Sequence, residues 1–143
     1  MEIRKLKLND IEFFNKTRLE SSKYLHESTD FTLEENIIWF TKNKPKYFIL
    51  YNNNQDIGYF RTSNWTTNSV YIGLDIAKKH RGNGYARKGY MIMFEYLKNL
   101  GIITIFLEVL QTNKRALYIY ESLGFKKCEI KQFKTTNSIK MKL

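Results

Sequence analysis

Alternating hydrophobic and polar residues predict strands near both ends of the chain. Residues 3–8 alternate over a length typical of a short strand, and near the carboxyl end Ile139, Met141 and Leu143 alternate with lysines. Apolar and aromatic stretches between these ends predict further strands, at residues 46–51, 57–62, 70–76, 102–110 and 127–133. Because a polar run separates the first two of these stretches, we expect a hairpin turn there.

Helix-type spacing and capping residues predict four helices. Asn9 and Asp10 are N-cap residue types ahead of the first helix, and Thr32 with Glu35 forms a capping box at the start of the second. The third helix has one apolar stripe, formed by Ala86, Tyr90, Met93, Phe94 and Leu97. The fourth helix spans residues 113–123 and ends before a glycine.

The order of these elements is β-α-α-β-β-β-α-β-α-β-β, which predicts an α/β fold class. We expect a single domain over residues 1–143, with a mixed, mostly antiparallel central sheet flanked by helices. Hydrophobic residues make up 43% of the chain, enough to fill a core and to exclude a disordered chain.

Composition and charge narrow the class of protein further. No apolar stretch approaches 18 residues and the first residues lack a signal-peptide pattern, so we expect a cytoplasmic protein without a membrane segment. Cys128 is the single cysteine and no Cys/His cluster has metal-ligand spacing, which predicts neither an internal disulfide nor a metal. The net charge of +10 favours an anionic partner.

The candidate chemistry starts at the turn between the strand at 70–76 and the third helix. Gly82 and Gly84 allow a tight turn that exposes N–H groups at a helix N-terminus, where a phosphate group binds well. Positive charge around this turn comes from Lys79, His80, Arg81, Arg87 and Lys88. A Gly-x-Gly pair alone can also merely separate a strand from a helix, and the longer glycine patterns of P-loop and dinucleotide-binding folds are absent.

Two segments resemble signature motifs of one enzyme family. Arg81-Gly82-Asn83-Gly84-Tyr85-Ala86 looks like the Arg/Gln-x-x-Gly-x-Gly/Ala acyl-CoA loop of the GCN5-related N-acetyltransferases (GNAT). The segment from Asn113 to Phe125 looks like the Asn-x-x-Ala-x-x-x-Tyr-x-x-x-Gly-Phe signature of the same family. Arg18, the Glu34–Phe40 stretch and Gly58-Tyr59 are similar to the subgroup of ribosomal-protein and amino-sugar acetyltransferases.

The resemblance implies a set of residues that bind acetyl-CoA as co-substrate. The loop residues of this set are Arg81, Gly82, Asn83, Gly84, Tyr85 and Ala86, whose backbone amides from Gly82 onward would hold the pyrophosphate. Leu74 and Ile76 match the strand that pairs with the pantetheine arm, and Asn113 matches a cofactor-contacting asparagine. Tyr120 matches the tyrosine that protonates the departing thiolate.

Two residues are the predicted catalytic groups. A phenol such as Tyr120 can donate a proton to the leaving sulfur, and Glu108 is the candidate base that accepts the amine proton directly or through water. We expect Glu108 to lie in a buried strand, which would raise its pKa. The alternatives are that Tyr120 only packs, that Glu108 faces solvent or a lysine, and that Asn113 is only a helix cap. His26 and His80 are expected at the surface.

These observations predict an acetyl-CoA-dependent N-acetyltransferase. The favoured acceptor is an amino sugar, free or nucleotide-linked, or another small amine, and the alternative is a protein N-terminus of the ribosomal-protein type. The aromatic residues Tyr24, Trp39, Tyr47, Tyr59, Phe60 and Trp65 are expected mostly in the core, with some lining the acceptor pocket. A non-catalytic CoA-binding module and a nucleic-acid-binding module are the other classes, and scattered basic residues disfavour nucleic acid. A homodimer is compatible with the sequence.

Overall fold

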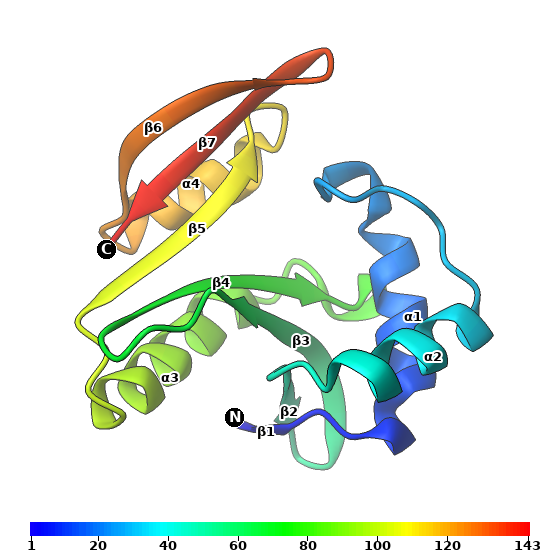
Figure 1. Cartoon of the computed structure of the whole chain (residues 1–143). Coiled ribbons are helices and arrows are strands. Elements are labelled where there is room, and N and C mark those ends of the chain that lie inside the picture. Colours follow the sequence, from blue (N-terminus) through cyan, green and yellow to red (C-terminus); the bar gives the residue numbers. More distant parts are fainter.

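One seven-stranded sheet runs through the molecule, in a computed structural model that describes all 143 residues (Figure 1). The strands lie in the order β1-β2-β3-β4-β5-β7-β6, and all neighbours are antiparallel except β4 and β5. The strands are β1 (Glu2–Lys5), β2 (Phe48–Asn52), β3 (Gln55–Ser63), β4 (Ser69–Ile76), β5 (Thr104–Leu110), β6 (Lys126–Phe133) and β7 (Thr136–Lys142). The helices are α1 (Ile11–Glu20), α2 (Leu33–Asn43), α3 (Tyr85–Asn99) and α4 (Lys114–Ser122), with short 3-10 turns at Leu8–Asp10, Ser22–Tyr24 and Lys78–His80. The predicted α/β class and element order are confirmed.

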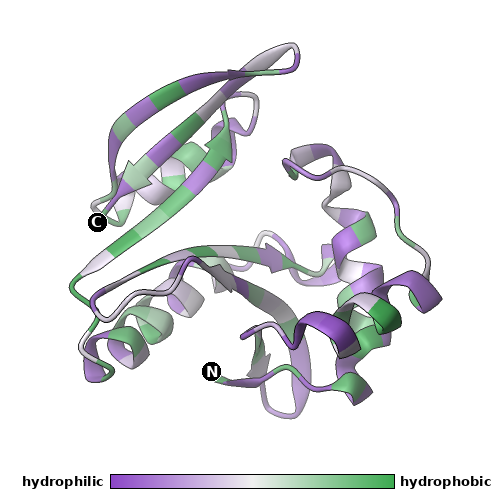
Figure 2. Ribbon diagram, viewed as in Figure 1, coloured by the Kyte–Doolittle hydropathy of each residue, from purple (hydrophilic) through white to green (hydrophobic).

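Alternation along the strands builds a core on each face of the sheet. Ile49 and Tyr59 point to one face, where they pack with Phe14 of α1. Phe60 points to the other face and packs with Tyr90 of α3 in the larger cluster. In Figure 2, β5 is mostly hydrophobic, whereas the edge strand β6 is largely hydrophilic. No helix is both long and apolar enough to cross a membrane.

Local signals in the sequence set two of the element boundaries. The β2–β3 hairpin is confirmed, and Asn53 and Asn54 at its turn have φ angles of 48° and 65°, as a two-residue hairpin turn of this hand requires. The capping box of α2 is also confirmed: Glu35 N–H donates to Thr32 Oγ1 at 3.1 Å, and Thr32 N–H donates to Glu35 Oε1 at 3.0 Å.

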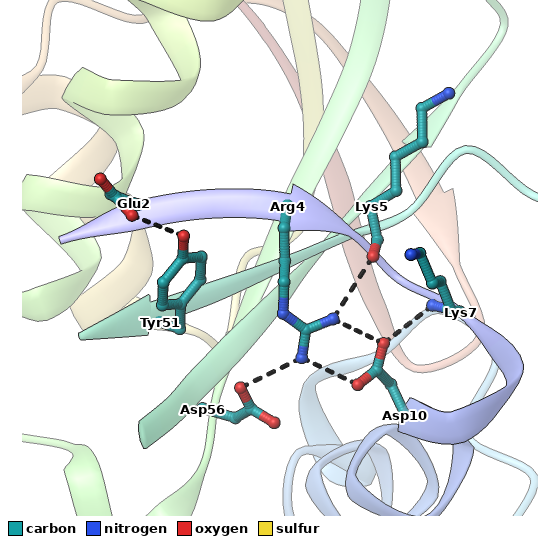
Figure 3. A network of polar contacts seen from close by, with 7 residues as sticks. All are labelled: Glu2, Arg4, Lys5, Lys7, Asp10, Tyr51 and Asp56. Atoms are coloured by element: carbon teal, nitrogen blue, oxygen red, sulfur yellow. Dashed lines mark hydrogen bonds and ion pairs between the residues drawn. The ribbon is translucent and has the colours of Figure 1, made fainter. Parts of the chain in front are cut away.

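Asp10 is the N-cap residue of α1, as predicted, but its side chain makes no capping hydrogen bond to that helix, because its carboxylate has other partners. Arg4 donates two hydrogen bonds of 2.8 Å to the two Asp10 oxygens, and the N–H of Lys7 donates a third (Figure 3). Arg4 also reaches Asp56 on β3 at 3.3 Å. These contacts lower the pKa of Asp10 against the opposing effect of burial. The first strand correspondingly ends at Lys5, earlier than the predicted residue 8.

Candidate active site

The parallel strands β4 and β5 diverge near the middle of the sheet. They pair at only three positions, from Ser69 opposite Thr104 to Tyr71 opposite Phe106. Beyond these positions β4 stays paired only with β3, and β5 only with β7. Figure 1 shows the two strands separating. Backbone groups on the facing edges therefore lack a strand partner, and the candidate site is built around this divergence.

Leu74 and Ile76, the predicted pantetheine positions, lie on the unpaired edge of β4. Ala77 donates its N–H to the Ile57 carbonyl on the β3 side at 2.9 Å. Successive residues of a strand direct their backbone groups to opposite sides, so those of Leu74 and Ile76 face the divergence. The Ile76 carbonyl accepts from Arg81 Nε at 3.0 Å, which leaves the Ile76 N–H and both backbone groups of Leu74 for a ligand.

Five consecutive backbone N–H groups are unpaired where the predicted loop enters α3. They belong to Gly82, Asn83, Gly84, Tyr85 and Ala86. Gly84 is the N-cap residue, has a φ of 75° and offers no side-chain cap, so these donors point away from the protein's own acceptors. The helix N-terminus adds partial positive charge. This arrangement fits a diphosphate such as that of acetyl-CoA.

The basic residues around the loop divide into two groups. Arg81 is tied to the end of α1, because its Nη2 donates to the Glu20 carbonyl and to Ser21 Oγ, both at 3.1 Å. Arg87 donates to Ser122 Oγ of α4 at 2.6 Å. Lys79 and Lys88 are exposed and make no ion pair. The two arginines brace the loop, and contacts of these basic residues with a phosphate stay a prediction.

Tyr120 lies on α4 beside the buried tyrosine of α3. The Tyr90 hydroxyl donates to the Tyr120 oxygen at 3.2 Å, and the two rings meet edge to face. Burial raises the pKa of Tyr120 above its usual value, and the hydrogen bond from Tyr90 lowers it only in part. Tyr120 thus keeps its proton near neutral pH, and its oxygen already has a donor that would stabilise a phenolate.

Asn113 caps the N-terminus of α4. Its side chain accepts a hydrogen bond of 3.3 Å from the Ala116 N–H, so Asn113 does cap this helix. A contact between Asn113 and a cofactor stays a prediction.

The expected burial of Glu108 is wrong. Leu107 and Val109 are buried, but Glu108 points to the opposite face of β5, where half of its side chain (49%) is exposed. Glu108 Oε2 lies 4.0 Å from Nε2 of His26, which is 2.6 Å from Ser138 Oγ. His26 was expected at the surface, but it is partly buried, and burial lowers its pKa despite the negative charge of Glu108.

A cavity of about 770 Å³ lies on the α1–α2 face of the sheet, in the size range of small-molecule pockets. Its aromatic lining consists of Phe14, Phe31, Trp39, Tyr47 and Tyr59. Its charged or titratable lining consists of Arg18, His26, Glu27, Glu35, Lys42 and Arg61. The expectation that some aromatic residues line a pocket is confirmed for Trp39, Tyr47 and Tyr59, while Tyr24 is exposed and not in the core.

Sequence reasoning missed three residues that the structure brings to this region. Arg61 and Asp75 lie on neighbouring strands with Arg61 Nε 3.3 Å from Asp75 Oδ2, and the charge of each affects the pKa of Tyr120. Tyr90 was recognised only as part of the apolar stripe. Its hydroxyl gave a signal, since a buried tyrosine hydroxyl needs a partner, but the sequence does not say which partner.

Comparisons with known proteins identify the family and the fold. A family model described as "Acetyltransferase (GNAT) family" matches residues 11–125. Among solved structures, a spermidine N-acetyltransferase SpeG mutant from Vibrio cholerae superposes with a TM-score of 0.85 at 21% identity, covering 100% of this chain and 94% of that one. A ribosomal-protein-alanine N-acetyltransferase from Brucella melitensis superposes with a TM-score of 0.81 at 15% identity, covering 100% of this chain and 99% of that one. The yncA structure from Salmonella typhimurium, solved with its cofactor acetyl-CoA, superposes with a TM-score of 0.80 at 15% identity, covering 100% of this chain and 92% of that one. No curated protein sequence matches the chain.

Proposed function

The chain belongs to the acetyltransferase (GNAT) family and is an acyltransferase with acetyl-CoA as its co-substrate; we propose that it acetylates the primary amine of a small molecule. The observation that carries this proposal is the position of the aromatic cavity. It lies on the α1–α2 face, while the row of free N–H groups lies at the start of α3, and the diverging strands separate the two. The amine and the thioester can therefore approach from opposite sides and meet at the divergence.

Tyr120 is the proposed acid. Acetyl-CoA supplies the activated acetyl group, whose transfer leaves a thiolate that needs a proton. Tyr120 holds its proton near neutral pH because burial raises its pKa. When the proton leaves, the hydrogen bond from Tyr90 is in place to stabilise the phenolate oxygen without reorganisation.

Glu108 is the proposed acceptor of the amine proton, with His26 between it and the cavity. His26 lines the cavity and lies 4.0 Å from Glu108. Burial lowers the pKa of His26 and keeps the imidazole neutral near pH 7, so one ring nitrogen can accept the amine proton while the other passes its proton to the Glu108 carboxylate.

The cavity favours a small amine, such as an amino sugar either free or nucleotide-linked, over a protein N-terminus. Its aromatic walls offer flat apolar surfaces of the kind that sugar and base rings pack against. The superposed structures include both a spermidine and a ribosomal-protein acetyltransferase, so their titles favour neither class. A cytosolic location and a homodimer stay predictions.

The test is thiol release from acetyl-CoA with a panel of amino sugars, amino acids, polyamines and N-terminal peptides. Under single-turnover conditions, Tyr120→Phe should slow transfer about a hundredfold to ten-thousandfold, with acetyl-CoA affinity nearly unchanged. Tyr118→Phe is the matched control, because Tyr118 is on the same helix and 74% exposed. Acetyl-CoA binding without thiol release from any amine would indicate a non-catalytic CoA-binding module. Binding of nucleic acid without binding of acetyl-CoA would refute the proposal altogether.

A further inference from the structure

The guanidinium of Arg61 lies against the backbone of Gly73, which has no side chain, at the wall of the cavity. The two residues are paired across β3 and β4. A Cβ placed on Gly73 would come within 2.5 Å of Arg61 Nη2 and 2.8 Å of Cζ, closer than real atoms approach. Only glycine at position 73 therefore leaves room for the guanidinium where it lies, pressed against β4.

Asp75 fixes the direction of this guanidinium. Its carboxylate is 7% exposed and lies 3.3 Å from Arg61 Nε, which is itself buried. Burial is the largest influence on Arg61 and opposes its charge, but Asp75 and the nearby tyrosines together outweigh it, so the pKa of Arg61 is raised and the side chain is always charged. The inner edge of the guanidinium thus faces Asp75, while 38% of the side chain remains exposed and lines the cavity.

The terminal nitrogens of Arg61 have no hydrogen-bond partner in the protein, in contrast to three other charged residues that line the cavity. Arg18 donates to the carbonyls of Thr29 and Glu27 at 2.7 and 2.8 Å. The carboxylate of Glu27 accepts a hydrogen bond from the Thr29 N–H, and that of Glu35 accepts one from the Thr32 N–H. Lys42 is exposed on α2 and adds to the lining a further positive charge that makes no ion pair.

We propose that Arg61, seated on Gly73 and oriented by Asp75, binds an oxyanion of the acceptor, a carboxylate or a phosphate. The fork of an arginine matches such a group with two parallel charge-assisted hydrogen bonds. The acceptor is then a molecule that carries both a primary amine and an anionic group. This inference rests on the proposed function and selects the substrate class of the same site.

The anion subsite lies close enough to the chemistry to position the amine. Arg61 is paired with Gly73, the neighbour of Leu74, whose backbone groups face the divergence of β4 and β5. An oxyanion held by Arg61 would therefore place the rest of a small acceptor between the cavity wall and the divergence of β4 and β5. A polycation such as spermidine would instead bring like charge against Arg61 and Lys42.

The experiment compares matched acceptors that differ in one charge. Glucosamine 6-phosphate is compared with glucosamine, and γ-aminobutyrate with its amide, so that the two pairs separate phosphate from carboxylate recognition. Binding is measured by calorimetry on the complex with CoA, which cannot transfer an acetyl group, and kcat/KM is measured by thiol release. We expect the wild-type protein to bind the anionic member of at least one pair about 10- to 150-fold more tightly.

Variants assign this preference to Arg61. Arg61→Met should abolish it and Arg61→Lys should restore part of it, while Lys16→Met, which removes an exposed charge on α1, should leave it intact. Gly73→Ala keeps every charge but displaces the guanidinium, so it should weaken binding of the anionic member alone. This variant tests the subsite even if Arg61→Met leaves Asp75 unpaired and unfolds.

Two results would overturn the inference. One is equal binding of both members of each pair by the wild-type protein, and the other is a charge preference that survives in both Arg61→Lys and Gly73→Ala. Thiol release without charge preference would refute the subsite and leave the proposed function standing. Charge-selective binding without thiol release from any amine would instead contradict the proposed function.

Discussion

Removing the Tyr90 hydroxyl is the sharpest perturbation of the proposed acid. Tyr90→Phe keeps the buried ring and its edge-to-face contact with Tyr120 but deletes the 3.2 Å hydrogen bond to the Tyr120 oxygen. A hydrogen bond to a charged group contributes about 1.5–3 kcal/mol. If the phenolate forms in the transition state, the rate of transfer should therefore fall about 10- to 150-fold. The affinity for acetyl-CoA should not change, because the neutral Tyr120 of the ground state gains much less from this bond.

A double-mutant cycle separates this mechanism from a loss of packing. After Tyr120→Phe there is no oxygen for Tyr90 to stabilise, so adding Tyr90→Phe should cost little further rate. Losing the hydrogen bond also raises the pKa of Tyr120, so the alkaline limb of the pH–rate profile should move to higher pH. Tyr96→Phe, on the same helix and without a hydrogen bond, is the control. The reasoning is refuted if single-turnover rates are unchanged in Tyr90→Phe, or if the two substitutions are fully additive.

Three further perturbations test other parts of the site. Gly84→Val forces a branched residue to a φ of 75° in the anion loop, so acetyl-CoA affinity by calorimetry should fall at least about tenfold; unchanged affinity in a folded variant would exclude the loop. Glu108→Gln should slow transfer most at low pH, with the loss shrinking as the amine deprotonates unaided; a pH-independent loss would remove its role as base. The pKa of His26 is lowered in the folded protein from its ordinary 6.5, so near and below pH 6.5 the unfolded chain binds more protons than the folded one. The free energy of unfolding therefore decreases as the pH is lowered through this range. Denaturation of His26→Asn should show a flatter dependence between pH 7 and 5, and an identical slope would refute the assignment.

The parts of the fold that could be predicted from sequence are those set by local chemistry. The Asn53–Asn54 turn and the capping box at Thr32 depend on residues within three positions of one another, and both formed as expected. The loop at Gly84 was located correctly for the same reason. Asp10 is a typical N-cap residue type, but its carboxylate instead accepts two hydrogen bonds from Arg4, six positions away.

Glu108 illustrates why the environment of a site residue could not be read from its strand. An apolar run such as that of β5 predicts burial on both faces, as in the centre of a covered sheet. The neighbouring strand β4, however, leaves β5 after three paired positions. The face that carries Glu108 therefore lies partly open, toward His26 of a loop 82 residues earlier in the chain. Nothing within β5 encodes that divergence.

The trio Tyr59, Arg61 and Asp75 was beyond sequence reasoning because it depends on register. All three point to the same face only because Tyr59 pairs with Asp75 and Arg61 with Gly73, and a slip by one residue would send one strand's set to the other face. Each also has a buried polar atom without a well-aligned hydrogen bond. Such atoms cost stability, about 1–3 kcal/mol each, and apolar residues at these positions would pack the α1–α2 face with no such cost. Groups of this kind beside a cavity are typical of a ligand-binding site, which agrees with the proposed anion subsite at Arg61.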